Sequence, residues 1–180
     1  LVVFHPVTTE FDNSKKQMES LLNAIKETQE QTILLWPNID AFSDNISRVV
    51  RGFREDNKDY PLHVYKNFPP DVYISVLAKT ACAVGNSSSF VRDASFIGTP
   101  VVLVGTRQDG REWCSSVIKV ESKKKDIFAA IKMQLSNGRY KCSDLYGQPG
   151  VSNKIAKTLV SLKPYTQKKL HYVNSTGTIV

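Results

Sequence analysis

The sequence predicts an α/β protein built on a parallel sheet with helices on both faces. Short apolar runs recur along the chain and alternate with amphipathic segments, a pattern typical of β–α–β units. One run, residues 101–104, is apolar at every position, as expected of a strand buried on both sides. Folds of this class bind ligands beyond the carboxyl ends of their strands, so we expect functional residues in the loops that follow the strands.

The apolar runs expected to form strands cover residues 1–4, 32–36, 62–65, 81–84, 101–104 and 117–120. The segments expected to form helices cover residues 14–30, 44–54, 70–78, 90–97, 125–135 and 151–162. In the segment 90–97, apolar residues recur at the spacing of one helix face. The pattern fades from Pro164, so we expect one domain over residues 1–163 and a loosely ordered tail over residues 164–180.

Composition excludes several classes of function. The chain of 180 residues is 41% hydrophobic and 23% charged, which is ordinary for a globular domain. No apolar run approaches the ~20 residues of a membrane helix, so we expect no membrane partner. The net charge of +7 comes from the last quarter of the chain rather than from one face with interleaved aromatic residues, so we expect no nucleic-acid partner.

The two ends and the cysteines carry further expectations. Three cysteines without CxxC spacing read as reduced thiols, which indicates a cytoplasmic protein. The chain begins inside a strand-like run and without Met, so we expect a part of a longer protein. Asp40 and Asp44 alone make no metal cluster, and no GxGxxG or Walker A sequence is present, so we predict neither a metal nor a cofactor.

The turn that begins at Gly85 is the most informative segment. It follows a buried run, contains Asn86 and the serines at 87–89, and leads into a helix. Such a turn presents backbone N–H groups to an anion, so it favours a nucleoside diphosphate or a nucleotide sugar. Asp93, further along the helix, is placed to accept a hydrogen bond from a sugar hydroxyl. The alternative is that Ser and Asn only cap the helix.

Other polar residues end the remaining strands. His5 follows the first run and suits acid–base work near neutral pH or phosphate binding; the alternative is a strand-end His bonded to a carbonyl. Asn38 either contacts a ligand or caps a helix. Arg107 and Arg111 lie in the loop after the fifth run, where guanidinium groups suit phosphate oxygens or make ordinary ion pairs, for instance with Glu112.

Motifs in this order resemble a known family: residues 5–9, 37–41, 85–88, 96–100 and 105–112. They are similar to the C-terminal half of the hydrolysing UDP-N-acetylglucosamine 2-epimerases. The resemblance is nearest to the type that begins sialic acid synthesis, including the epimerase half of the animal bifunctional epimerase/kinase. It covers about residues 1–163, and its specificity lies in the number and order of the motifs.

The resemblance implies a Rossmann-like domain, the second of a two-domain GT-B fold that holds a UDP-sugar between its halves. It implies that UDP leaves by elimination and that water then adds, giving N-acetylmannosamine and free UDP. The family's proton-transferring carboxylates belong to the N-terminal half, which this chain lacks. We therefore expect an inactive fragment whose partners are UDP-N-acetylglucosamine or UDP, the missing N-terminal domain and, at full length, further copies of the protein.

The resemblance also implies roles for individual residues. Ser87 and Ser88 would hold the diphosphate at the helix start. Asp93 stands where the family has a Glu that holds the ribose hydroxyls, so its shorter side chain is a departure. The backbone near Phe68 would read the uracil edge.

His5, Asn38 and Arg107 match family positions near the diphosphate and sugar, and His5 is the residue expected to be catalytic. Arg48 and Arg51 match basic residues of a site that binds CMP-sialic acid as a feedback inhibitor in the animal enzymes. Asp44 and Asn67 do not match that site's other contacts. Two alternatives remain open, namely the donor domain of a GT-B glycosyltransferase and a non-catalytic nucleotide-binding module.

Overall fold

The computed structural model describes residues 1–37 and 43–163 and contains the predicted parallel sheet. Its strands are β1 (Val2–Val3), β2 (Thr32–Leu35), β3 (Leu62–Tyr65), β4 (Ala83–Gly85), β5 (Val101–Val104) and β6 (Val117–Val120). They lie side by side in the order β3-β2-β1-β4-β5-β6, and every neighbouring pair is parallel. The predicted α/β class is therefore confirmed.

The helices also follow the predicted segments. They are α1 (Ser14–Thr28), α2 (Ser43–Asp56), α3 (Pro70–Lys79), α4 (Ser88–Ile97), α5 (Lys124–Asn137) and α6 (Val151–Ser161), with a 3-10 segment η1 (Thr8–Asn13) before α1. The amphipathic spacing explains the first five, because each buries one face against the sheet or a neighbouring helix. The segment η1 differs from the sequence analysis, which predicts no helix between the first strand and residue 14.

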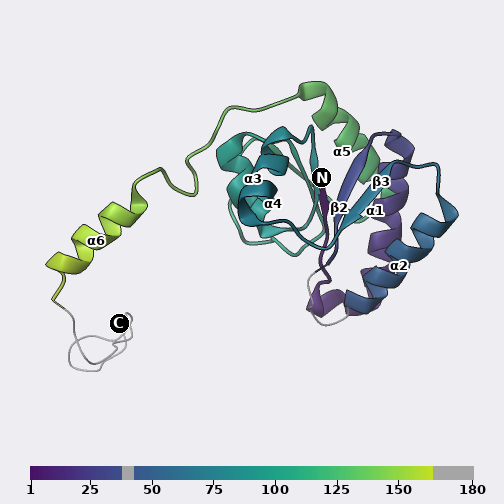
Figure 1. Ribbon diagram of the computed structural model, residues 1–180, viewed down its shortest axis with the longest axis horizontal. Helices are drawn as coiled ribbons and strands as arrows, with labels where there is room; N and C mark the ends of the chain where they lie inside the picture. The colour runs from purple at the N-terminus through teal and green to yellow at the C-terminus, as the bar shows by residue number, and fades with distance from the viewer. Residues whose placement is uncertain (38–42, 164–180) are drawn as a thin grey trace. The chain divides into compact units, whose positions relative to one another are not determined.

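Two layers of helix cover the sheet. Helices α1, α2 and α5 pack on one face through residues such as Met18, Ile46 and Ile127, whereas α3 and α4 pack on the other through Leu77 and Phe90 (Figure 1). Alternate residues of the strands point to opposite layers. Val102 and Val104 belong to the first core, and Val101 and Leu103 belong to the second. A strand between two apolar layers needs apolar residues at every position, which accounts for the run 101–104.

The strand order reverses beside β1, at the centre of the sheet. The chain adds β2 and β3 on one side of β1, and β4, β5 and β6 on the other. β1 pairs with β2 on one side and with β4 on the other, so that Val3 lies opposite both Leu35 and Gly85. Because all strands are parallel, their carboxyl ends share one edge, as the sequence predicted. The gap between the loops after β1 and β4 is the switch point at which such sheets bind ligands.

The beginning of α4 differs from the prediction in position. β4 spans Ala83–Gly85 rather than 81–84, and α4 begins at Ser88 rather than at Phe90. Ser88 and Ser89 thus belong to the first turn of the helix, and not to the turn before it. The cause is Ser87, which caps the helix by accepting a hydrogen bond from the Ser89 N–H.

The connection from β5 to β6 also differs from the predicted alternation. Residues 105–116 cross between these neighbouring strands through turns, with no helix among them. A buried side chain of α5 supports the start of both strands, because the Gln134 amide donates hydrogen bonds to the Val101 and Ser116 carbonyls (2.7 and 2.9 Å). Arg107 therefore lies at the carboxyl edge of the sheet in a segment that contains no helix.

The chain divides into two compact units, Leu1–Tyr146 and Gly147–Val180. The second unit contains α6, none of whose residues is buried. The predicted tail, residues 164–180, lies outside the described residues, so the predicted domain boundary at 163 stays a prediction. No helix in the described part of the chain is both long and apolar enough to cross a membrane.

Candidate functional site

Asn86 joins the loops at the switch point. Its side-chain oxygen accepts a hydrogen bond from the His5 N–H (2.8 Å), and its side-chain amide donates to the His5 carbonyl (2.8 Å). Its own N–H donates to the Val3 carbonyl (3.1 Å). The Asn86 side chain thus extends the β1–β4 ladder by one residue beyond the strands. Both Asn86 and His5 are buried, so these bonds are shielded from water.

Gly85 permits this close approach. Its φ of 142° is a conformation that side-chain-bearing residues rarely adopt, and a Cβ at this position would lie 2.0 Å from the Val3 carbonyl oxygen. Only glycine therefore fits between the ends of β1 and β4. The result is a rigid platform from which α4 begins.

The amino end of α4 presents unpaired donors. The Ser89 N–H bonds to the Ser87 Oγ and the Phe90 N–H bonds to the Ser87 carbonyl, whereas the Ser87 and Ser88 N–H groups bond to no described residue. The Ser87 and Ser88 side chains are half-buried and so remain within reach of solvent. Two N–H groups at the positive end of a helix dipole are suited to a phosphate.

Tyr73 of α3 contacts the start of α4. Its hydroxyl makes a short hydrogen bond with the Ser89 Oγ, which in turn lies 2.9 Å from the Ser87 Oγ. Burial raises the pKa of Tyr73, helped by the charge of Asp93, whereas its contacts with Ser89 and Ser87 lower it. Asp93 lies one helical turn after Ser89 on the same face of α4 and is half-buried.

Arg107 belongs to the loop after β5 and lies beside Asn86, next to the start of α4. Its Nη1 donates to the Asn86 carbonyl at 3.2 Å, and the buried Gln108 Nε2 donates to the same oxygen at 2.8 Å. The rest of the Arg107 side chain is exposed. A guanidinium group is thereby held beside the serine turn with donors to spare.

Glu10 connects the loop after β1 to the loop after β5. Its carboxylate accepts a short hydrogen bond from the Thr106 hydroxyl and another from the Gln17 Nε2 (2.7 Å). Further along the loop, Asp109 pairs with Lys119 at 2.5 Å. The alternative of an ion pair between Arg111 and Glu112 is not found among the described residues. Arg111 is instead exposed and forms a backbone turn through its N–H to the Gln108 carbonyl.

Phe68 lies in the loop between β3 and α3. It is half-buried against the core beneath α3 and α4, and its ring centre lies 5.0 Å from that of the exposed Tyr65. This loop follows β3 at the same edge as the other loops. Asn38, also expected at this edge, lies outside the described residues.

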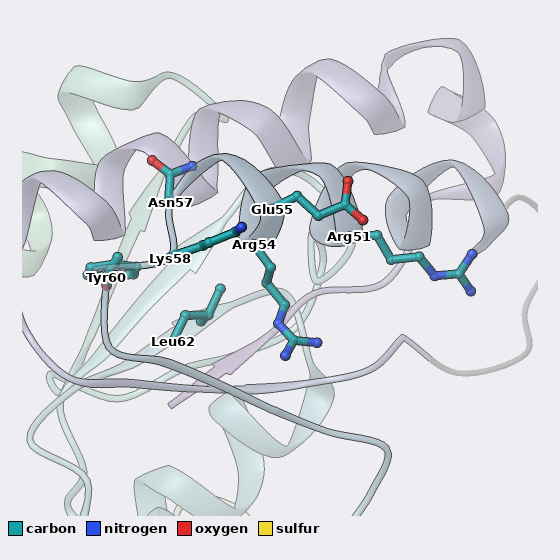
Figure 2. Close-up of a pocket in the computed structure, with 7 residues that line it drawn as sticks. All are labelled: Arg51, Arg54, Glu55, Asn57, Lys58, Tyr60 and Leu62. Atoms are coloured by element: carbon teal, nitrogen blue, oxygen red, sulfur yellow. The ribbon is translucent and has the colours of Figure 1, made fainter.

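Arg48 and Arg51 both project from α2, but they line different hollows. Arg48 lies in a hollow between α1 and α2 that also includes Lys15 and Asn23. Arg51 stacks on Trp36, with its guanidinium carbon 5.5 Å from the ring centre, and shares two other hollows with Arg54. Figure 2 shows the side chains of Arg51 and Arg54 extending from α2 beside the pocket, and both residues are exposed. The regulatory role of Arg48 and Arg51 stays a prediction.

The structure thus brings together His5, Ser87, Ser88, Asp93 and Arg107 around the switch point. Sequence reasoning missed the roles of Asn86, Gln108 and Tyr73, which depend on contacts between distant strands and helices. A signal for Asn86 was present, because it stands between a buried strand and the serine turn.

The three cysteines are all free. Cys82 is buried, and burial raises its pKa to about 12.

The chain is similar to known proteins over most of its length. The family model described as UDP-N-acetylglucosamine 2-epimerase matches residues 1–160. A UDP-N,N'-diacetylbacillosamine 2-epimerase (hydrolyzing) of Legionella pneumophila is 30% identical over 168 residues, which are 93% of this chain and 44% of the relative. A UDP-N-acetylglucosamine 2-epimerase of Neisseria meningitidis is 28% identical, over 80% of this chain and 37% of the relative.

Solved structures show the same fold. A UDP-GlcNAc 2-epimerase from Methanocaldococcus jannaschii matches with a TM-score of 0.65 at 13% identity, over 88% of this chain and 45% of that chain. A co-structure of S. aureus MnaA with UDP matches with a TM-score of 0.63 at 15% identity, over 93% and 48%. The fold is therefore that of a Rossmann-like domain of GT-B type.

The fold defines the class, a Rossmann-like α/β domain. The family match makes the assignment specific: this chain belongs to the UDP-N-acetylglucosamine 2-epimerase family. It spans less than half the length of the curated relatives that it matches.

Proposed function

We propose that this chain is the UDP-binding half of a hydrolysing UDP-N-acetylglucosamine 2-epimerase. One observation carries the proposal: the Ser87 and Ser88 N–H groups at the start of α4 bond to no described residue, and the Arg107 guanidinium is held next to them at the Asn86 carbonyl, at the switch point of the sheet. The name of the Legionella relative and the UDP in the S. aureus co-structure support this ligand and this reaction class.

The chemistry follows from what these groups stabilise. UDP leaves UDP-N-acetylglucosamine by elimination, which builds negative charge on the leaving phosphate. Fixed N–H dipoles and a guanidinium stabilise that charge most in the transition state. Water then adds to the glycal intermediate and yields N-acetylmannosamine. Asp93 holds the ribose, the backbone near Phe68 reads the uracil edge, and His5 serves catalysis beside the diphosphate. Asn38, which lies outside the described residues, is a candidate contact for the diphosphate and sugar.

The remaining parts of the reaction belong to the longer protein. The carboxylates that move protons come from an N-terminal domain, so this chain alone binds UDP and turns over no substrate. We place the full-length enzyme, a homo-oligomer, in the cytoplasm, where it supplies N-acetylmannosamine for sialic acid or related amino-sugar synthesis. Arg48 and Arg51 are its candidate contacts for CMP-sialic acid.

Isothermal titration of the chain with UDP tests the binding half of the proposal. We expect saturable heat in the millimolar range or below, and a chain that gives none at millimolar UDP contradicts it. For the full-length protein, we expect free N-acetylmannosamine from UDP-N-acetylglucosamine without any acceptor. A glycosyltransferase would need an acceptor, and a non-catalytic module would release no sugar.

A further inference from the structure

Three hydroxyl groups at the start of α4 form one connected row. The Tyr73 hydroxyl bonds to the Ser89 Oγ, and the Ser89 Oγ lies 2.9 Å from the Ser87 Oγ. Tyr73 comes from α3, and its ring packs among the partly buried members of the core beneath α3 and α4. The row therefore begins in a fixed, partly dry environment and ends at the helix cap, where the ligand-facing N–H groups lie.

The direction of the protons in this row follows from donor strength. A phenol is more acidic than an aliphatic alcohol, so Tyr73 is the better donor to Ser89. The Ser89 Oγ, having accepted from Tyr73, has its own proton left to donate to the Ser87 Oγ. The Ser87 Oγ also accepts from the Ser89 N–H at 3.4 Å. With two bonds accepted, Ser87 has only its proton left to offer outward.

We propose that Tyr73 is a positioning residue that turns the Ser87 hydroxyl into a hydrogen-bond donor toward the diphosphate. This inference rests on the proposed function, because it presumes that the diphosphate of UDP lies at this end of α4. Tyr73 itself does not contact the ligand. It acts through Ser89, and the two serines transmit the orientation.

Removal of the Tyr73 hydroxyl should reverse this orientation. Without it, the Ser89 Oγ is free to accept from Ser87, so the Ser87 proton turns inward and lone pairs face the phosphate. The loss of affinity should concern only the diphosphate, which is the charged part of the ligand. Asp93, which we assign to the ribose, makes no hydrogen bond with Tyr73 among the described residues, although its charge acts on Tyr73. The base is assigned to the loop at Phe68. Both parts should therefore be little affected, whereas a general loss of packing would weaken all parts together.

The test uses the Tyr73→Phe variant of the whole chain, titrated by NMR with UDP and separately with uridine, which lacks the diphosphate. We expect the dissociation constant for UDP to rise roughly three- to tenfold and that for uridine to stay within about twofold. Tyr60→Phe is the matched control. Its hydroxyl bonds to Thr32 and to the Ile25 and Glu30 carbonyls before β2, at the opposite edge of the sheet, so both constants should match the wild type.

A second variant tests the route through Ser89. In a Ser89→Ala background, Tyr73→Phe should cause no further loss of UDP affinity. An unchanged UDP constant in Tyr73→Phe, an equal loss for UDP and uridine, or a full additional loss in the Ser89→Ala background would each overturn the inference. A wild-type chain that binds uridine but gains nothing from the diphosphate would instead overturn the proposed function at its base.

Discussion

The side chain of Asn86 binds both backbone groups of His5, donating to its carbonyl and accepting from its N–H at 2.8 Å each. It thereby behaves as one more residue of the β1–β4 ladder. The polypeptide on either side of the switch point is held by this side chain where the strands themselves have ended. This side chain therefore helps to set the position of His5 relative to the serine turn.

Replacement of Asn86 by Ala should destabilise the fold. It leaves the N–H and carbonyl of His5 buried without these partners, so we expect the free energy of unfolding in urea to fall by about 2–4 kcal/mol. Asn23 is the control, because its side chain bonds to the Glu19 carbonyl on the exposed surface of α1. Asn23→Ala should change the free energy by less than about 0.5 kcal/mol. Equal effects of the two variants would contradict the role given to Asn86.

Two glycines should respond to Ala in opposite directions. At Gly85 the new Cβ would meet the Val3 carbonyl oxygen at 2.0 Å in a strained backbone conformation, so we expect a loss of about 3 kcal/mol or more. At Gly52, within α2, a Cβ meets nothing within 4 Å, so Ala should stabilise the helix by about 0.5–1 kcal/mol. Thermal unfolding of both variants measures this difference, and a tolerated Ala at 85 would refute the close approach.

Arg107→Ala and Ser88→Ala should each weaken UDP binding by about 1–3 kcal/mol, because the first removes the guanidinium and the second removes the hydroxyl donor beside the free N–H groups of the α4 start. Arg107 is exposed and Gln108 still bonds to the Asn86 carbonyl, so Arg107→Ala should leave the free energy of unfolding nearly unchanged. Lys26→Ala, in the last turn of α1, removes the same charge elsewhere and should keep wild-type affinity. If Lys26→Ala weakened UDP as much as Arg107→Ala, net charge alone would explain the effect.

The buried thiol of Cys82 should make stability depend on alkaline pH. Burial raises its pKa from 9.0 to about 12, so the folded protein keeps this proton after the unfolded chain has lost it. The stabilisation is complete below pH 9 and is lost progressively between about 9 and 12. Relative to Cys82→Ala, the wild type should lose about 2 kcal/mol between pH 8.5 and 10.5.

Urea unfolding at both pH values gives this difference. Cys142→Ala is the control, since Cys142 is exposed in the folded protein and should respond to pH as the wild type does. A wild type and a Cys82→Ala variant whose stabilities fell in parallel across this range would show that the thiol ionises as easily in the folded chain.

The sequence predicted the sheet and the helices well because burial leaves a periodic trace. Val101–Val104 is apolar throughout since it lies between two helix layers, and the spacing of Phe90, Val91 and Ala94 marks the buried face of α4. The prediction of Ser87, Ser88 and Arg107 as phosphate contacts rests on residue types that suit phosphate and on their positions after strands.

The contacts that fix the site were not predictable in the same way. The role of Asn86 follows from the register that sets Val3 opposite Gly85, and Tyr73 meets Ser89 only because α3 packs beside α4. Such contacts join residues far apart in the sequence and leave no spacing to detect. The helix-free path from β5 to β6 was hidden for a related reason, since its support comes from Gln134 on another helix.

The helix-free connection from β5 to β6 has a consequence for how relatives diverge. Without a helix of its own, the segment that carries Arg107 takes its shape from Glu10, Asn86 and Lys119, which belong to other parts of the chain. Exchange of this segment alone between family members would separate it from its anchors. Loop transplantation here should succeed only when the anchoring side chains travel with the graft.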